Sequence, residues 1–124
     1  MQPAIRVLLV EDNDVYRESL EFLLGRREGI QVVGGVATGT AAASACAELA
    51  ADVAVIDYRL PDVDGGEAAA ALRDRCPRTH VVLLSASAGL DEQEAARVSG
   101  LPLVRKDAGI DALVSAVRAA AGQP

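Results

Sequence analysis

Continuous apolar runs recur along the chain and alternate with segments of helical spacing. A run that is apolar at every position predicts a strand buried on both faces, as in a parallel sheet covered by helices. The last run is the shortest, and Pro102 just before it favours the start of an edge strand. The predicted strands are Ile5–Val10, Ile30–Val36, Val53–Ile56, His80–Leu84 and Leu103–Val104.

Between these runs, two segments carry apolar residues every three or four positions, which predicts amphipathic helices. Three further segments contain good helix formers but have weaker apolar faces. Asp91–Ser99 has the poorest stripe, so we expect this helix to be the most mobile one. The two striped segments contain Tyr16, Leu20, Leu23 and Leu24, and Ile110, Leu113, Val114 and Val117; the weaker ones are Thr40–Ala51, Glu67–Arg75 and Asp91–Ser99.

Five strands that alternate with five helices predict an α/β domain with a doubly wound, open parallel sheet and helices on both faces. A length of 124 residues suits a single domain. Folding should bury roughly two-thirds of the surface that a chain of this size exposes when unfolded. We therefore expect one domain over residues 1–124, with 119–124 forming the start of a linker.

Composition and charge exclude several function classes. Only 2% of the residues are aromatic, which leaves few platforms for stacking bases, and the net charge of −6 opposes nonspecific binding to nucleic acid or to an anionic membrane. Cys46 and Cys76 stand far apart without a CxxC motif, which favours neither a zinc site nor a disulfide framework. The apolar run Ile5–Val10 is too short for a signal peptide or a membrane span, so we expect a soluble, cytoplasmic protein.

Polar residues stand where the predicted strands end. Ligands of parallel sheets bind beyond the carboxyl ends of the strands, because these ends share one edge. Glu11 and Asp12 follow the first strand, Asp57 follows the third, Ser85 the fourth and Lys106 the fifth. We therefore expect three carboxylates, a hydroxyl and an ammonium group to converge on one site.

This set of side chains suits phosphoryl chemistry. Three close carboxylates repel one another unless a cation compensates, and hard oxygen ligands suit Mg²⁺ or Mn²⁺. One carboxylate can then attack a phosphoryl group and form an acyl phosphate. The transferring group needs positive charge and hydrogen-bond donors around its oxygens, which Lys106 and Ser85 would supply.

Several short segments, taken together in their order and spacing, resemble the CheY-like receiver domain of two-component response regulators. The resemblance covers about residues 5–120, nearly the whole chain. It implies a flavodoxin-like (βα)5 fold with strand order 2-1-3-4-5. The segments are Ile5–Asp12, Val55–Gly65, Val82–Ala86 and Lys106–Asp107.

The resemblance implies that Asp57 is the phosphoacceptor, which receives a phosphoryl group from the phospho-His of a cognate sensor histidine kinase. It implies that Glu11, Asp12 and Asp57 hold Mg²⁺ (or Mn²⁺), together with the backbone carbonyl of Arg59. Receivers of this kind catalyse only their own phosphorylation and dephosphorylation. We therefore expect a signalling domain rather than an enzyme that acts on other substrates.

Further roles follow from the same resemblance. Ser85 matches the hydroxyl that binds the phosphoryl group, and Lys106 matches the lysine that pairs with it. The side chains of Arg59 and Ser87 match the variable positions beside the path of the attacking water, so we expect them to set the dephosphorylation rate.

Two features are similar to NarL/LuxR-type receivers: Asp107 and Ala108 follow the lysine, and Tyr58 follows Asp57. Such receivers carry a helix-turn-helix output domain that regulates transcription. No such domain is present in this sequence, so the chain either acts alone or has been separated from an output domain. We expect no direct contact of this chain with nucleic acid or membrane, and a homodimer upon phosphorylation is a candidate assembly.

One position departs from the family pattern. Receivers usually have Tyr or Phe three residues before the lysine, as an aromatic switch, and Leu103 stands there instead. Ser85 and Leu103 are therefore the candidate switch residues, with the aromatic readout in question. This departure leaves open an alternative: a degenerate, phosphorylation-independent receiver that serves as a protein-interaction module.

A third hypothesis is a phosphatase or phosphotransferase with an aspartyl nucleophile. Haloacid-dehalogenase-type enzymes have a second Asp two residues after the nucleophile as the acid–base group. Arg59 occupies that position here, which disfavours turnover of external substrates. Binding of Mg²⁺ would separate the phosphoacceptor from the interaction module.

Overall fold

The computed structural model describes residues 3–86 and 89–123 of the chain. Its strands are β1 (Ile5–Val10), β2 (Ile30–Val36), β3 (Val53–Asp57), β4 (His80–Ser85) and β5 (Leu103–Arg105). Its helices are α1 (Asp14–Gly25), α2 (Ala42–Leu49), α3 (Gly65–Arg75), α4 (Leu90–Ser99) and α5 (Ile110–Ala120), with a short 3₁₀ turn η1 (Lys106–Ala108) before α5.

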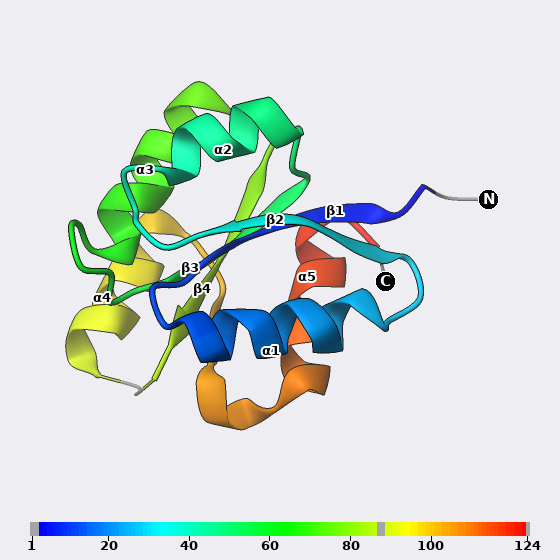
Figure 1. The fold of residues 1–124 in the computed structure, drawn as a ribbon. Coiled ribbons are helices and arrows are strands. Elements are labelled where there is room, and N and C mark those ends of the chain that lie inside the picture. Colours follow the sequence, from blue (N-terminus) through cyan, green and yellow to red (C-terminus); the bar gives the residue numbers. More distant parts are fainter. Residues whose placement is uncertain (1–2, 87–88, 124) are drawn as a thin grey trace.

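The strands form one parallel sheet in the order β2-β1-β3-β4-β5 (Figure 1). Helices α1 and α5 pack on one face of this sheet, and α2, α3 and α4 pack on the other. The predicted doubly wound, flavodoxin-like fold with strand order 2-1-3-4-5 is confirmed.

Two hydrophobic cores lie on the two faces of the sheet. The core under α1 and α5 contains large aliphatic side chains such as Leu20, Leu24 and Leu113, all 5% exposed or less. The core under α2, α3 and α4 is filled mostly by alanines on the helix side, and α4 contributes only Ala96 to it. The poor apolar stripe predicted for α4 therefore corresponds to weak packing.

Several element ends differ from the sequence prediction by one or two residues. β3 and β4 each extend one residue further, so that Asp57 and Ser85 belong to the sheet. The ladder continues because the Tyr58 N–H donates to the Leu84 carbonyl over 2.9 Å. A strand-terminal residue held in this way has a fixed direction, which matters for the site.

Helix α2 is shorter than the predicted Thr40–Ala51. At its start, the backbone N–H groups of Gly39 and Thr40 donate to the carboxylate of Asp62, over 2.9 and 2.8 Å, and form a loop instead of a helical turn. At its end, Ala50 adopts the left-handed conformation with φ of 51°. The sequence pattern did not reveal the long-range contact with Asp62.

Gly65, at the start of α3, is required by close packing. A Cβ atom at this position would lie 2.6 Å from the Tyr58 Cα and 2.8 Å from the Asp57 carbonyl oxygen. Backbone atoms at that distance cannot yield, so a residue without a side chain is needed. The close approach fixes the β3–α3 loop against the end of β3.

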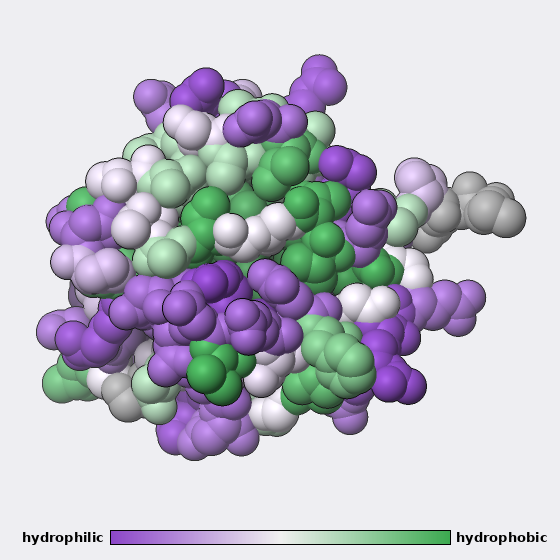
Figure 2. Space-filling view, viewed as in Figure 1, coloured by the Kyte–Doolittle hydropathy of each residue, from purple (hydrophilic) through white to green (hydrophobic). Residues whose placement is uncertain are grey.

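Figure 2 shows hydrophobic side chains gathered around the exposed edge strand β2, between α1 and α2, and hydrophilic side chains over α1. Pro3 and Gln123, near the two ends of the described chain, line one pocket at the end of the sheet opposite the carboxyl ends of the strands (Figure 1). Among the helices in the described part of the chain, none is long and apolar enough to cross a membrane.

Candidate functional site

Three carboxylates meet at the carboxyl ends of β1 and β3, which are neighbours in the sheet. Glu11 and Asp57 are buried, with exposed fractions of 1% and 5%, whereas Asp12 is exposed. One oxygen atom from each of the three residues lies within 4.8 Å of the others. The predicted convergence of these acids on one site is therefore present in the structure.

The Glu11 side chain is held in place by the backbone around it. Its Oε2 atom accepts a hydrogen bond from the Asn13 N–H over 3.2 Å. Its own N–H donates to the Val36 carbonyl over 3.0 Å, and its carbonyl oxygen accepts from the Arg17 guanidinium over 2.6 Å. These contacts fix the orientation of the Glu11 side chain. Its other carboxylate oxygen, Oε1, is available to a cation in the site.

That cation is Lys106, at the start of η1. Its Nζ atom lies 2.6 Å from Glu11 Oε1 and 3.3 Å from Asp57 Oδ2. Burial acts to lower the pKa of Lys106, but its hydrogen bond with Glu11 and the charge of Asp57 outweigh that effect, and the pKa is raised. Lys106 thus remains protonated and compensates two buried carboxylates.

Tyr16 is part of this arrangement, although its sequence spacing indicated only an apolar helix face. The Lys106 Nζ atom lies 4.5 Å from the centroid of the Tyr16 ring, which is the geometry of a cation–π contact. Burial raises the pKa of the Tyr16 hydroxyl, and the charge of Lys106 acts in the opposite direction. The only sequence signal was its position in the first turn of α1, four residues after Asp12.

The second oxygen of Asp57 faces the β3–α3 loop. Asp57 Oδ1 accepts a hydrogen bond from the Arg59 N–H over 3.3 Å. The loop closes through a bridge between Arg59 and Asp64 and through the Gly65 N–H, which donates to the Tyr58 carbonyl over 2.6 Å. The backbone of Arg59 is thereby fixed next to the carboxylate of Asp57.

Of the remaining predicted site residues, two lie in β4 and β5, the strands that follow β3 in the sheet. Ser85 is buried at the end of β4, the strand next to β3. Leu103 is half-buried in β5, where it pairs with Leu83 and packs against the core under α2, α3 and α4. Ser87 lies outside the described residues.

Glu92, which the sequence pattern did not single out, is 1% exposed in the first turn of α4. The Arg59 guanidinium lies 2.8 Å from Glu92 Oε1 and forms an ion pair with it. Glu92 stands three residues after Gly89, the N-cap residue of α4. A Glu at this position often contacts the backbone at the start of the helix. Nothing in the sequence indicated that this carboxylate would be buried.

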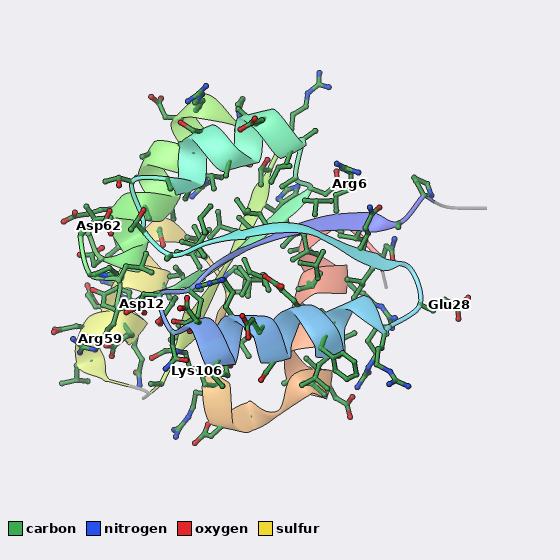
Figure 3. The ribbon with its side chains drawn as sticks, viewed as in Figure 1. Arg6, Asp12, Glu28, Arg59, Asp62 and Lys106 are labelled. Atoms are coloured by element: carbon green, nitrogen blue, oxygen red, sulfur yellow. The ribbon has the colours of Figure 1, made fainter. Side chains whose placement is uncertain are left out.

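The acidic cluster has the donors that a hard divalent cation prefers. Glu11, Asp12 and Asp57 offer carboxylate oxygens at mutual distances that one ion can span. Positive charge already lies beside the cluster, because Lys106 forms ion pairs with Glu11 and Asp57. In Figure 3, Asp12, Lys106 and Arg59 lie at the same end of the molecule, whereas Arg6 and Glu28 lie at the other. The residues present therefore fit a divalent metal site.

Residues 7–118 match the family model of the response regulator receiver domain. Since the match covers most of the chain, this protein belongs to the receiver family of response regulators. Members of this family are phosphoacceptor signalling modules, and the resemblance found in the sequence is confirmed.

Its relatives include receivers of the NarL/LuxR type. The chain is 31% identical to the response regulator protein VraR of Staphylococcus epidermidis over 111 residues, which are 90% of this chain and 49% of VraR. The receiver domain of NarL from Mycobacterium tuberculosis superposes with a TM-score of 0.89, at 31% identity, over 99% of this chain and 100% of that one. A LuxR-family response regulator from Aurantimonas sp. SI85-9A1 gives 0.88 at 29% identity, over 97% and 87%. The chain spans about half the length of VraR.

Proposed function

We propose that this chain is the phosphoacceptor domain of a two-component phosphorelay, in which Asp57 accepts a phosphoryl group from a cognate sensor histidine kinase. One observation carries the proposal. The buried Asp57 carboxylate lies 3.3 Å from a protonated lysine and shares a cluster of oxygen atoms with Glu11 and Asp12. Such an arrangement provides a nucleophile, a cation for the transferring group and ligands for a metal ion.

In the proposed reaction, a carboxylate oxygen of Asp57 attacks the phosphorus atom of the phospho-His. A phosphorus–oxygen bond forms, the phosphorus–nitrogen bond breaks, and the imidazole nitrogen leaves with the electron pair. The Lys106 ammonium group compensates the charge on the phosphoryl oxygens, and the Ser85 hydroxyl donates a hydrogen bond to one of them. Hydrolysis of the acyl phosphate by water then returns Asp57 to its carboxylate form.

The metal ion that we propose is Mg²⁺ or Mn²⁺, which when bound neutralises negative charge on the phosphoryl oxygens. The side chains of Glu11, Asp12 and Asp57 and the carbonyl of Arg59 would hold it. Asn13 and Arg17 support this role, since their contacts with Glu11 keep its carboxylate directed into the site.

The proposed output is control of transcription through a helix-turn-helix domain that would follow the linker starting at residues 119–124. NarL/LuxR-type relatives, and the share of VraR that the chain covers, support this assignment. We propose that the side chains of Arg59 and Ser87 set the dephosphorylation rate, that phosphorylation favours a homodimer, and that the domain works in the cytoplasm, as receivers typically do.

The test is incubation of the purified protein with Mg²⁺ and acetyl phosphate, followed by intact mass measurement. The wild type is expected to gain one phosphoryl group, and Asp57→Asn is expected to gain none. Asp74→Asn, at an acid near the end of α3, serves as the matched control and should be phosphorylated like the wild type. A wild type without an adduct, or an adduct that survives in Asp57→Asn, would contradict the proposal.

The half-buried Leu103 supports a second candidate function, a phosphorylation-independent interaction module. No aromatic ring occupies that position in β5, so the switch that depends on one is absent. A Mg²⁺ titration separates the two candidates. Binding that Asp12→Asn weakens supports the phosphoacceptor, whereas no binding together with no adduct favours the interaction module.

A further inference from the structure

Glu92 is the least satisfied buried charge among the residues that the structure describes. Its side chain is 1% exposed, and neither carboxylate oxygen accepts a hydrogen bond. A buried carboxylate without compensation is strongly unfavourable. Two sources of positive potential act on it: the N-terminal end of α4, in whose first turn it lies, and the guanidinium of Arg59.

The contact between Glu92 and the start of α4 is tight. A Cβ atom added at the N-cap residue Gly89 would clash with Glu92 Oε2. The first helical hydrogen bond, from the Gln93 N–H to the Gly89 carbonyl, spans 3.1 Å beside it. The position and the partner of the Glu92 carboxylate therefore affect the stability of the first turn of α4.

Arg59 connects this turn to the phosphoacceptor. Its backbone N–H donates to Asp57 Oδ1, while its guanidinium forms the ion pair with Glu92 in the first turn of α4. The Arg59 side chain is 71% exposed, so the guanidinium can change partners with little loss of packing. A phosphoryl group on Asp57 would offer the planar guanidinium two oxygen acceptors and more negative charge than one carboxylate.

The ion pair is asymmetric in a way that favours such an exchange. Arg59 loses little when it leaves Glu92, because an exposed guanidinium is well solvated. Glu92 loses much, because it remains buried without its cation. A change at Asp57 that attracts Arg59 would therefore destabilise mainly α4.

We infer that Arg59 transfers the phosphorylation signal from Asp57 to α4 by exchanging its partner, Glu92, for the phosphoryl group. Glu92 is the positioning residue: it holds Arg59 in the unphosphorylated protein, and the loss of this pair destabilises the first turn of α4. The inference rests on the proposed function, and it supplies a route to α4 that does not need an aromatic residue at Leu103.

The experiment measures amide hydrogen exchange of residues 93–95 by NMR before and after phosphorylation by acetyl phosphate and Mg²⁺. In that reaction the bond from phosphorus to the acetate oxygen breaks, acetate leaves, and a bond from phosphorus to an Asp57 oxygen forms. In the wild type, we expect exchange of these amides to become roughly tenfold faster upon phosphorylation. In Glu92→Gln, which buries no charge, we expect a change of less than about twofold.

The matched control is Glu94→Gln, which breaks the exposed ion pair between Glu94 and Arg97 in the same helix. It should respond to phosphorylation as the wild type does. An unchanged α4 in the phosphorylated wild type, or a full response in phosphorylated Glu92→Gln, overturns this inference and leaves the proposed function intact. If the wild type acquires no phosphoryl group, the proposed function is overturned, and the inference with it.

Discussion

Two cationic residues contact Asp57, Lys106 through its ammonium group and Arg59 through its backbone N–H, and their charged side chains have different surroundings. Lys106 is 22% exposed and binds two carboxylates that are nearly buried, with the Tyr16 ring beside it. Arg59 is 71% exposed and pairs with a single carboxylate, Glu92, that belongs to another element of the fold. The first cation is enclosed by the site, whereas the second lies at its rim.

This difference separates two tasks. An enclosed ammonium group held by two carboxylates is already in place for a developing negative charge, which is what catalysis of phosphoryl transfer needs. An exposed guanidinium with one buried partner can leave it, which is what a switch needs. Substitutions on the Lys106 side should therefore change the chemistry, and those on the Arg59 side should change stability and the response of α4.

The largest effect is expected for Lys106→Met, which removes the compensating charge from the site. We expect phosphorylation by acetyl phosphate to be about 100-fold slower, the effect typical of removing one preorganised charge-stabilising group. Mg²⁺ should still bind, and more tightly, because a competing cation is gone. Time courses of the adduct by intact mass, together with a Mg²⁺ titration, test both points. Arg105→Met, which removes a neighbouring cation paired with the exposed Asp107, is the control and should react like the wild type.

On the other side, Arg59→Met leaves the buried Glu92 carboxylate without its cation. We expect the free energy of unfolding to fall by about 1–3 kcal/mol. This loss is smaller than is usual when a fully buried ion pair is broken, because the Arg59 side chain is exposed. The double variant Arg59→Met/Glu92→Gln should regain most of that loss, since no buried charge remains. Urea unfolding of the three proteins measures this, and a double variant less stable than Arg59→Met would refute the explanation.

A smaller effect is expected where α4 begins. Gly89→Ala places a methyl group against Glu92 Oε2 and should displace the carboxylate, lowering stability by roughly 1 kcal/mol. Gly25→Ala is the matched control, because a Cβ atom at the end of α1 meets nothing within 4 Å. Its stability should equal or exceed that of the wild type by up to about 1 kcal/mol. Thermal unfolding of both variants shows whether the crowding at Gly89 is responsible.

The smallest effect concerns the loop that carries Arg59. The N–H groups of Gly39 and Thr40 hold the pKa of Asp62 well below its ordinary value of 3.8. A carboxyl group with a lowered folded-state pKa adds stability above pH 3.8 that is lost as the pH falls through the folded-state pKa. Asp62→Asn should therefore lower the Tm at pH 7, and the difference from the wild type should shrink in acid. A constant difference from pH 7 into acid would show that the charge of Asp62 is not the cause.

Much of the architecture was predictable from local pattern. Apolar runs identified all five strands, and helical spacing or composition identified the five helices, because a buried parallel sheet imposes that alternation on the chain. The acids after β1 and β3 were predicted to meet, and they do, since carboxyl ends of neighbouring parallel strands share one edge. The start of α2 was missed, because Asp62 binds Gly39 and Thr40 from a distant loop.

The sequence by itself thus determined the fold class, the end of the sheet where chemistry gathers, and the residue types available there. Only the tertiary structure decided which charges pair: Lys106 with Glu11 and Asp57, and Arg59 with Glu92. The physical reason is that periodicity reports which face of an element is apolar. The burial of a charge and the choice of its partner depend instead on distances between elements that are far apart in the chain.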